Sequence, residues 1–294
     1  MALPTVRFHN TPAGANSSTV ENFMAALHTE IIAAGWTIEY ADSDAIGGGS
    51  AGTPAWDKSP VTNTDAGIAV YKMPKNGHDT NWFVRLRPGW AANTNRPHMR
   101  GITIGTTHDG TGGVTGGTTE LTPGVATTQS DNRQILLAAS EDGFALHLIF
   151  TDNVNVIVER ARRSDTGVVT DDILAFVGYG NGSGQSALIR AGVGAVHTHN
   201  PVVLGGFSNG LTATNFGSGV SLENHDGSHI PIVGPYWLRG HPFWHGRHSF
   251  LVSYQDHPAN SDRTIVIDGV PRVYKVNANG AQGNVWALWA VATE

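Results

Sequence analysis

One serine in a glycine-rich frame is the best candidate for a catalytic group. Gly206-Phe-Ser208-Asn-Gly210 matches the G-x-S-x-G pattern of a nucleophile elbow and follows the apolar run Val202-Val203-Leu204. That chemistry needs the serine on a sharp strand-to-helix turn, where a histidine can deprotonate it. The next residues, 211–219, are rich in Thr, Gly and Ser and do not form a helix pattern. We therefore interpret Ser208 as a turn serine, and a serine hydrolase is the less favoured alternative.

Histidines are the candidate metal ligands. His197 and His199 alternate as strand residues on one face do, and three imidazoles suffice for zinc. No H-E-x-x-H motif is present, and Pro242 and Gly246 exclude a helix that would present ligands four residues apart. We predict scattered polar histidines and assign no metal ligand or cofactor. The other candidates are His225 and His229 and the set His241, His245 and His248. A metal shared between subunits is the alternative for these histidines, and the sequence leaves it open whether His241, His245 and His248 bind one.

Phosphate and carboxylate motifs are also weak. Gly178-Tyr-Gly-Asn-Gly-Ser-Gly184 fails the G-x-G-x-x-G register, and without a Gly-Lys pair there is no Walker A loop, so we predict a flexible loop. Glu141-Asp142 and Asp171-Asp172 are adjacent pairs, whose side chains would point to opposite faces of a strand. Nothing here indicates paired-carboxylate glycosidase chemistry.

Arginines form one dense cluster, Arg160, Arg162 and Arg163, beside Glu159 and Asp165. We interpret the cluster as a solvated strand end. The chain carries 18 basic and 24 acidic residues, a formal charge of −6, without a basic tail. A nucleic-acid partner bound through its phosphates is therefore not predicted.

An aromatic cluster near the C-terminal end admits three interpretations. Tyr236-Trp237 and Phe243-Trp244 lie close to Arg239, Arg247 and two of the histidines. Large amphipathic rings serve as interface hot spots, as platforms for sugars, or as core residues. The sequence does not decide among the three for Tyr236, Trp237 and Trp244.

The composition indicates a β protein. Charged residues make up 14% of the chain, and 37 residues are Gly, which suits short strands joined by turns. The absence of Cys excludes disulfides and thiolate metal sites. We find no stretch with signal-peptide or membrane-spanning character, so we expect a soluble, non-secreted chain without a membrane partner.

One helix is predicted near the N-terminus. A capping box, Ser18-x-x-Glu21, precedes a stripe of Val20, Phe23, Leu27 and Ile31, with Met24 and Ile32 beside it. Gly35 ends the helix, and Trp36, Ile38 and Tyr40 then alternate with polar residues as one face of a strand.

Elsewhere the apolar period is two, which predicts sheets with one wet and one dry face. Phe144–Phe150 and Val154–Val158 form a hairpin around Thr151-Asp152-Asn153, and Asp268-Gly269 joins a second one. Pro271 places the returning strand at an edge or bulge. The segment Trp286–Val291 is apolar on both faces and predicts a buried last strand.

The predicted fold is therefore mainly β, sandwich-like and antiparallel, with one N-terminal helix and long Gly-rich loops at 42–66, 105–130 and 205–231. Loops of this length favour contacts with neighbouring subunits. We divide the chain into residues 1–180, a helix plus β domain, and residues 181–294, a second β region that is either separate or continuous with the first.

Scattered segments over most of the chain resemble tailed-bacteriophage virion proteins. They are Ala34-Gly-Trp36, Asn81-Trp-Phe-Val-Arg-Leu86, Asp142–Leu148 with Val154–Arg160, and Ile267–Tyr274. The resemblance implies a non-enzymatic structural subunit of the tail, baseplate, neck or capsid surface, assembled in the bacterial cytoplasm and located in the virion. Its implied partners are other virion proteins and copies of itself. The alternative is a β module of the virion that binds a host-surface glycan.

Overall fold

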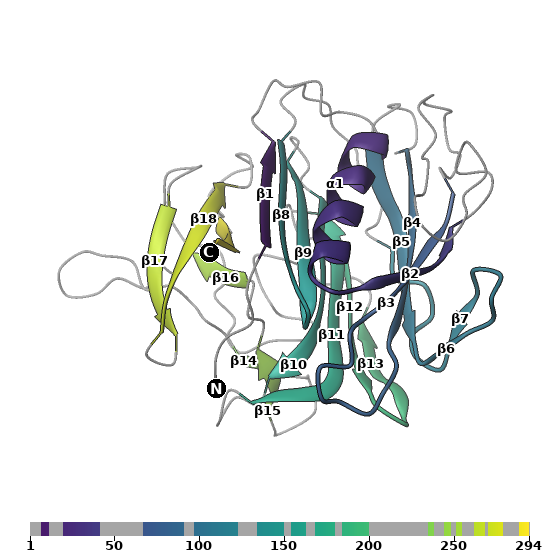
Figure 1. Cartoon of the computed structure of the whole chain (residues 1–294). Helices are drawn as coiled ribbons and strands as arrows, with labels where there is room; N and C mark the ends of the chain where they lie inside the picture. The colour runs from purple at the N-terminus through teal and green to yellow at the C-terminus, as the bar shows by residue number, and fades with distance from the viewer. Residues whose placement is uncertain are drawn as a thin grey trace.

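Strands dominate the described part of the chain (Figure 1). The computed structural model describes residues 7–11, 20–41, 67–90, 97–122, 134–149, 154–162, 168–179, 184–199, 235–237, 244–247, 251–254, 262–267, 270–278 and 288–293. These residues hold one helix and form one seven-stranded sheet, two four-stranded sheets and two two-stranded ribbons. The predicted mainly β fold with an N-terminal helix is confirmed.

The seven-stranded sheet is antiparallel throughout and joins strands from both predicted domains. Its order is β1 (Arg7–Thr11), β8 (Gln134–Ser140), β9 (Gly143–Ile149), β10 (Val154–Arg162), β11 (Val169–Tyr179), β12 (Gly184–Arg190) and β13 (Gly194–His199). The first predicted hairpin is confirmed, because Val154 pairs with Leu148. The sheet continues past residue 180, and the division of the chain into domains stays a prediction.

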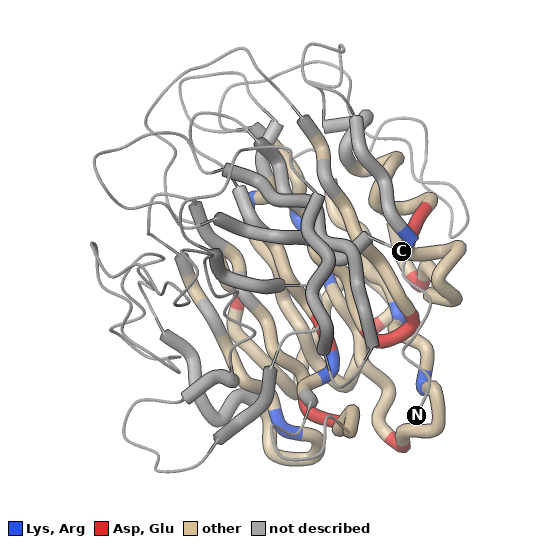
Figure 2. Tube along the Cα trace, turned by 90° about the vertical axis from the view of Figure 1, so that its left-hand side faces the viewer, with Lys and Arg blue, Asp and Glu red and all other residues tan. Residues whose placement is uncertain are grey.

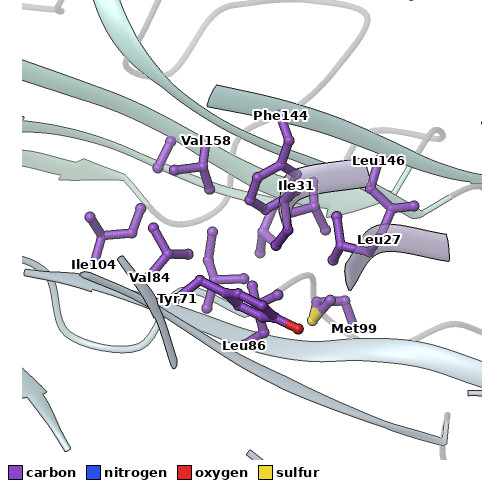
Figure 3. Packing of buried hydrophobic residues seen from close by; sticks show 14 of the residues in the cluster. Leu27, Ile31, Tyr71, Val84, Leu86, Met99, Ile104, Phe144, Leu146 and Val158 are labelled. Carbon is purple, nitrogen blue, oxygen red and sulfur yellow. The ribbon is translucent and has the colours of Figure 1, made fainter. Parts of the chain in front are cut away.

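A four-stranded sheet faces the seven-stranded one across the main core. It contains β2 (Thr37–Ala41), β3 (Ala69–Lys72), β4 (Phe83–Trp90) and β5 (Pro97–Gly105), in that order. Figure 3 shows Phe144, Leu146 and Val158 of one sheet opposite residues of the other sheet, here Tyr71, Val84, Leu86, Met99 and Ile104. The fully buried Tyr71 hydroxyl lies 3.0 Å from His28 Nδ1, and burial raises its pKa well above the usual range.

Helix α1 (Val20–Ala33) packs into the same core. Met24, Leu27 and Ile31 have no exposed surface, as the predicted apolar stripe requires. Gly35 adopts φ 93°, which confirms the predicted left-handed helix end. Ser18 and the side chains of Val20 and Phe23 lie outside the described part. Among the described residues, no helix is long and apolar enough to cross a membrane.

The prediction of one wet face is wrong for the centre of the seven-stranded sheet. Val156, Ile157 and Val158 are consecutive on β10 and all fully buried. The face that carries Ile157 also buries Leu174 and Leu188. Strand β15 (Trp244–Arg247) contacts β10, and β19 (Leu288–Thr293) contacts β8. Sheet residues buried on both faces read as continuous apolar runs rather than alternating ones.

The third sheet contains the second predicted hairpin. Its order is β16 (Leu251–Tyr254), β19, β18 (Val270–Ala278) and β17 (Asp262–Ile267), and Ile267 pairs with Val270 as predicted. The edge or bulge predicted for the strand of Pro271 is wrong, because β18 lies between β17 and β19 and pairs with β17 without a register shift. Pairing with β19 begins only at Val273. Pro271, which has no N–H, therefore does not have to donate a hydrogen bond to β19. The predicted last strand is present as β19, and its side chains lie outside the described part.

Residues 106–121, which we call the outer segment, are irregular apart from two short strands and one bridge, as predicted for the loop 105–130; residues 123–130 lie outside the described part. The segment contains the ribbon β6 (Thr107–His108) and β7 (Val114–Thr115). Leu121 exchanges backbone hydrogen bonds of 2.8 and 2.9 Å with Ile102 of β5. A Cβ at Gly105 would overlap the Thr115 carbonyl, so glycine lets the two backbones approach. Loops 42–66 and 205–231 lie outside the described residues.

Candidate functional site

A buried arginine joins the two facing sheets. The Arg160 side chain on β10 is fully buried, although the sequence predicted a solvated strand end there. Its Nη1 donates to Asp171 Oδ1 at 2.7 Å, and its Nη2 donates to the Pro74 carbonyl at 3.0 Å. Pro74 belongs to the loop between β3 and β4, so the guanidinium replaces its hydration with groups from both sheets. A buried charge is tolerated only with such partners.

Both oxygens of the Asp171 carboxylate accept hydrogen bonds from protein donors. Its Oδ2 accepts hydrogen bonds from Thr80 N at 3.0 Å and from Thr80 Oγ1 at 2.5 Å. The Asp171 carbonyl accepts one from Trp82 Nε1 at 2.8 Å. Burial alone would raise the pKa of Asp171, but the hydrogen bonds from Thr80 and Arg160 outweigh it and lower the pKa below its usual value. The carboxylate is thus ionised at neutral pH.

A second acidic residue lies near Arg160. Asp142, in the β8–β9 turn, accepts a 3.3 Å hydrogen bond from Asn76 Nδ2, and its carbonyl accepts one from Arg160 N at 2.8 Å. Nearby, burial and then the charge of Arg160 lower the pKa of His78, which favours the neutral imidazole. We call Arg160, Asp171, Thr80, Asp142 and the Pro74 carbonyl the Arg160 centre.

The groups of the Arg160 centre bind one another and are poorly suited to proton transfer. Both Asp171 oxygens accept donors from the protein, so this carboxylate has little capacity to act as a general base. Arginine stays cationic and cannot transfer a proton at ordinary pH. Within the described ranges, no group of three or more His, Asp or Glu side chains is arranged to hold a metal ion.

A second ionic cluster lies on the outer face of the four-stranded sheet. Glu120 of the outer segment accepts a 3.0 Å hydrogen bond from Arg85 Nη1 and another from Arg87 Nη2, both on β4. The three side chains retain 21–26% of their exposure. A Cβ at Gly101 would lie 2.6 Å from Glu120 Cδ, so glycine makes room for the carboxylate. We call these three charged residues the Glu120 cluster.

Three aromatic rings meet beside this cluster, and we call Tyr40, Phe83 and His108 the aromatic patch. The His108 ring lies 6.2 Å from the Tyr40 ring and 5.8 Å from the Phe83 ring, between centroids. Lys72 Nζ lies 6.0 Å from the Phe83 centroid. All three rings are partly exposed. This geometry places three partly exposed rings and a cation on one surface.

A β-bulge creates the aromatic patch. Ile38 pairs with Tyr71, but Tyr40 pairs with Val70, so an extra residue, Glu39, shifts the register. The predicted common face of Trp36, Ile38 and Tyr40 is therefore wrong at Tyr40. Trp36 is buried, whereas Tyr40 contacts the outer segment. One inserted residue turns the next side chains to the opposite face.

Most residues singled out from the sequence lie elsewhere or outside the described part. Ser208 and its motif are outside it, as are His225, His229, His241 and His248. His197 and His199 lie on β13, where they pair with Leu188 and Ser186. Trp237 of β14 (Pro235–Trp237) pairs with Trp244 of β15, which also contains His245. The side chains of these strands are not described, so the interpretations of the aromatic cluster stay open.

Two weaker motifs are resolved by strand pairing. Gly178 pairs with Gly184, so the glycine-rich segment closes the β11–β12 hairpin, with only residues 180–183 left outside the described strands. Asp172 accepts a 3.2 Å hydrogen bond from Ala191 N, whereas Asp171 contacts Arg160. This pair points to different partners, as predicted. Glu141 and Asp142 lie in a turn, where the strand argument does not apply.

The sequence did contain a signal for the Arg160 centre. Arg160 has the same parity as Val154, Val156 and Val158, the predicted dry face of its strand. Asp171 likewise has the parity of Ile173, Ala175 and Val177 on the neighbouring strand. Strict alternation would have placed an opposite-charge pair inside the sandwich.

Comparison with known proteins adds no relative. No protein-family model matches the chain, and no curated protein matches it significantly.

Proposed function

We propose that this chain is a non-enzymatic structural subunit of a tailed-phage virion, located in the tail, baseplate, neck or capsid decoration. It acts through contacts with copies of itself and with other virion proteins. The observation that carries the proposal is the Arg160 centre, in which the buried guanidinium joins the two sheets through its bonds to Asp171 and to the Pro74 carbonyl. Such charges serve the architecture rather than a substrate.

Two further observations support an architectural role. Charged residues are sparse along the described chain (Figure 2), and the central strands of the seven-stranded sheet are buried on both faces. Packed sheets of this kind form a scaffold that carries its connecting loops at the surface. Such loops are available for contacts with other subunits. The resemblance of segments such as Asn81–Leu86 to virion proteins supports the particular assembly.

The mass of the native particle tests this proposal. We expect mass photometry to show a defined multimer, and mass spectrometry of the co-purified proteins to identify other virion components. A lone 31.1 kDa monomer without partners would overturn the proposal.

A separate experiment tests the hydrolase alternative. An active serine nucleophile would be labelled by a fluorophosphonate probe in the wild type and not in Ser208→Ala. Ser218→Ala, in the same glycine-rich segment, is the matched control. We expect no labelling at Ser208; labelling that Ser208→Ala abolishes and Ser218→Ala retains would make the protein an enzyme.

A further inference from the structure

The aromatic patch has the chemistry of a carbohydrate site. We infer that Tyr40, Phe83 and His108 bind an uncharged, hydroxyl-rich oligosaccharide on the outer face of the four-stranded sheet. The C–H face of a sugar ring packs on an aromatic face, while its hydroxyls need polar groups around that face. This inference does not depend on the proposed assembly role.

The rings are held by the fold before any ligand arrives. Phe83 projects from β4, a strand paired on both sides, and Tyr40 is aimed by the β2 bulge. His108 Nε2 accepts a 3.3 Å hydrogen bond from Gly112 N, which fixes the position of its ring. A Cβ at Gly112 would lie 2.8 Å from Tyr40 Cε1, so this backbone packs directly on the tyrosine. Rigid rings lose little entropy on binding.

Polar groups surround the rings. Asp109 follows His108 and is fully exposed, and its Oδ1 accepts hydrogen bonds from Thr111 N at 2.7 Å and Gly113 N at 2.9 Å. These bonds lower the pKa of Asp109, so an ionised acceptor faces solvent at neutral pH. Lys72 adds a donor beside Phe83. A sugar hydroxyl both donates and accepts, which matches this mixture.

Charges of both signs lie around the patch, which favours an uncharged ligand. The cations are Lys72, Arg85, Arg87 and Arg100 on β3, β4 and β5, and the carboxylates are Glu39, Asp109 and Glu120 on β2 and the outer segment. An anionic or cationic ligand would meet charges of its own sign as well as opposite ones.

A protein partner fits this surface less well. The core of a protein interface is apolar, yet the large hydrophobic residues exposed in the described part are Val168 and Val193, and neither belongs to the patch. Apart from its rings, the surface presents charged groups. We therefore favour a sugar and treat a protein partner as an outcome of the test.

Calorimetric titration and saturation-transfer NMR of the full chain test the inference, with maltopentaose, cellopentaose and chitopentaose as probes. We expect at least one of them to bind and to give saturation transfer. Phe83→Tyr, which keeps the ring, should bind like the wild type. Phe83→Leu, which keeps apolar volume but removes the ring, should weaken binding at least about tenfold. Val193→Ala, on the β12–β13 hairpin, is the control.

Three results would overturn the inference. They are no binding of any probe, equal binding by Phe83→Leu and Phe83→Tyr, or a loss of binding in Val193→Ala. If Phe83→Leu changes the mass of the native particle while no probe binds, the patch is a protein interface instead. The particle mass is read separately, so failure of the sugar site leaves the assembly proposal standing.

Discussion

Two arginine–carboxylate clusters in this molecule use the same chemistry in different surroundings. In the Arg160 centre the guanidinium has no exposed surface, and Asp171 retains 24% of its side-chain exposure. In the Glu120 cluster each side chain keeps 21–26%. Removing a charge from water costs several kcal/mol per ion, whereas a surface pair loses little hydration. We therefore expect the first cluster to be indispensable and the second to contribute little to stability.

The clusters also differ in what they connect. Arg160 and Asp171 tie the seven-stranded sheet to the loop before β4 through Pro74 and Thr80. Glu120 ties the outer segment to β4 of the sheet beneath it, where backbone pairing of Leu121 with Ile102 already holds the segment. Loss of the Arg160 centre should therefore weaken the contact between the two sheets. Loss of the Glu120 cluster should weaken only the attachment of the outer segment.

The largest expected effect is that of Asp171→Ala. It leaves the buried Arg160 charge without its carboxylate, which should lower the free energy of unfolding by about 3–5 kcal/mol. Urea unfolding followed by circular dichroism measures the loss. Asp172→Ala, the next residue with its own partner at Ala191 N, is the control and should cost far less. Equal losses in the two variants would show that a carboxylate paired with the buried Arg160 contributes no more to stability than one without such a partner.

The double variant Arg160→Met with Asp171→Leu sharpens the comparison. Replacing a whole buried ion pair by apolar residues is often neutral or stabilising, whereas breaking it is not. We expect the double variant to recover about 3–5 kcal/mol relative to Asp171→Ala in the same urea assay. If it is the less stable of the two, the Arg160 charge itself is required by the fold, even without its partner.

The next largest effect is the loss of stability of the Arg160 centre at low pH. The pKa of Asp171 is lower in the folded protein than in the unfolded chain, so its stabilisation is present above the unfolded pKa. That stabilisation is lost as pH falls through the folded pKa, below about pH 4. Urea midpoints between about pH 6 and pH 2 should show a steeper decline for the wild type than for Asp171→Asn. Parallel curves would contradict the role given to this carboxylate.

The smallest effect is expected for Glu120→Gln. An exposed or half-exposed ion pair contributes up to about 1 kcal/mol, and salt screens part of it. The variant should unfold within that margin of the wild type, and the difference should shrink between about 0.05 and 1 M NaCl. A loss as large as that of Asp171→Ala would show that the outer segment is needed by the whole sandwich.

Local features were predictable wherever neighbouring residues decide the structure. The stripe of Met24, Leu27 and Ile31 and the cap at Gly35 identified the helix, because an α-helix needs only its own periodicity and a left-handed end. The turn pair Asp268-Gly269 identified a hairpin, because the two-residue turn sets the pairing of Ile267 with Val270. The mainly β class followed from the same local rules.

The candidate sites depended on contacts between distant residues. Arg160 is buried because Pro74 and Asp171 meet it from another loop and another strand, and no local charge count shows that. The glycine-rich outer segment lies directly against β5, because Gly105 has no Cβ to meet the Thr115 carbonyl.

The sequence by itself determined the elements, through periodicity, caps and turn residues. Only the tertiary structure decided which polar residues lost their water and which aromatic rings met. A one-residue bulge sent Tyr40 to the outer face, and the fold brought β6 beside β4 so that His108 meets Phe83. Burial and ring contacts are set by pairing over long sequence distances, whereas secondary structure is set by neighbours along the chain.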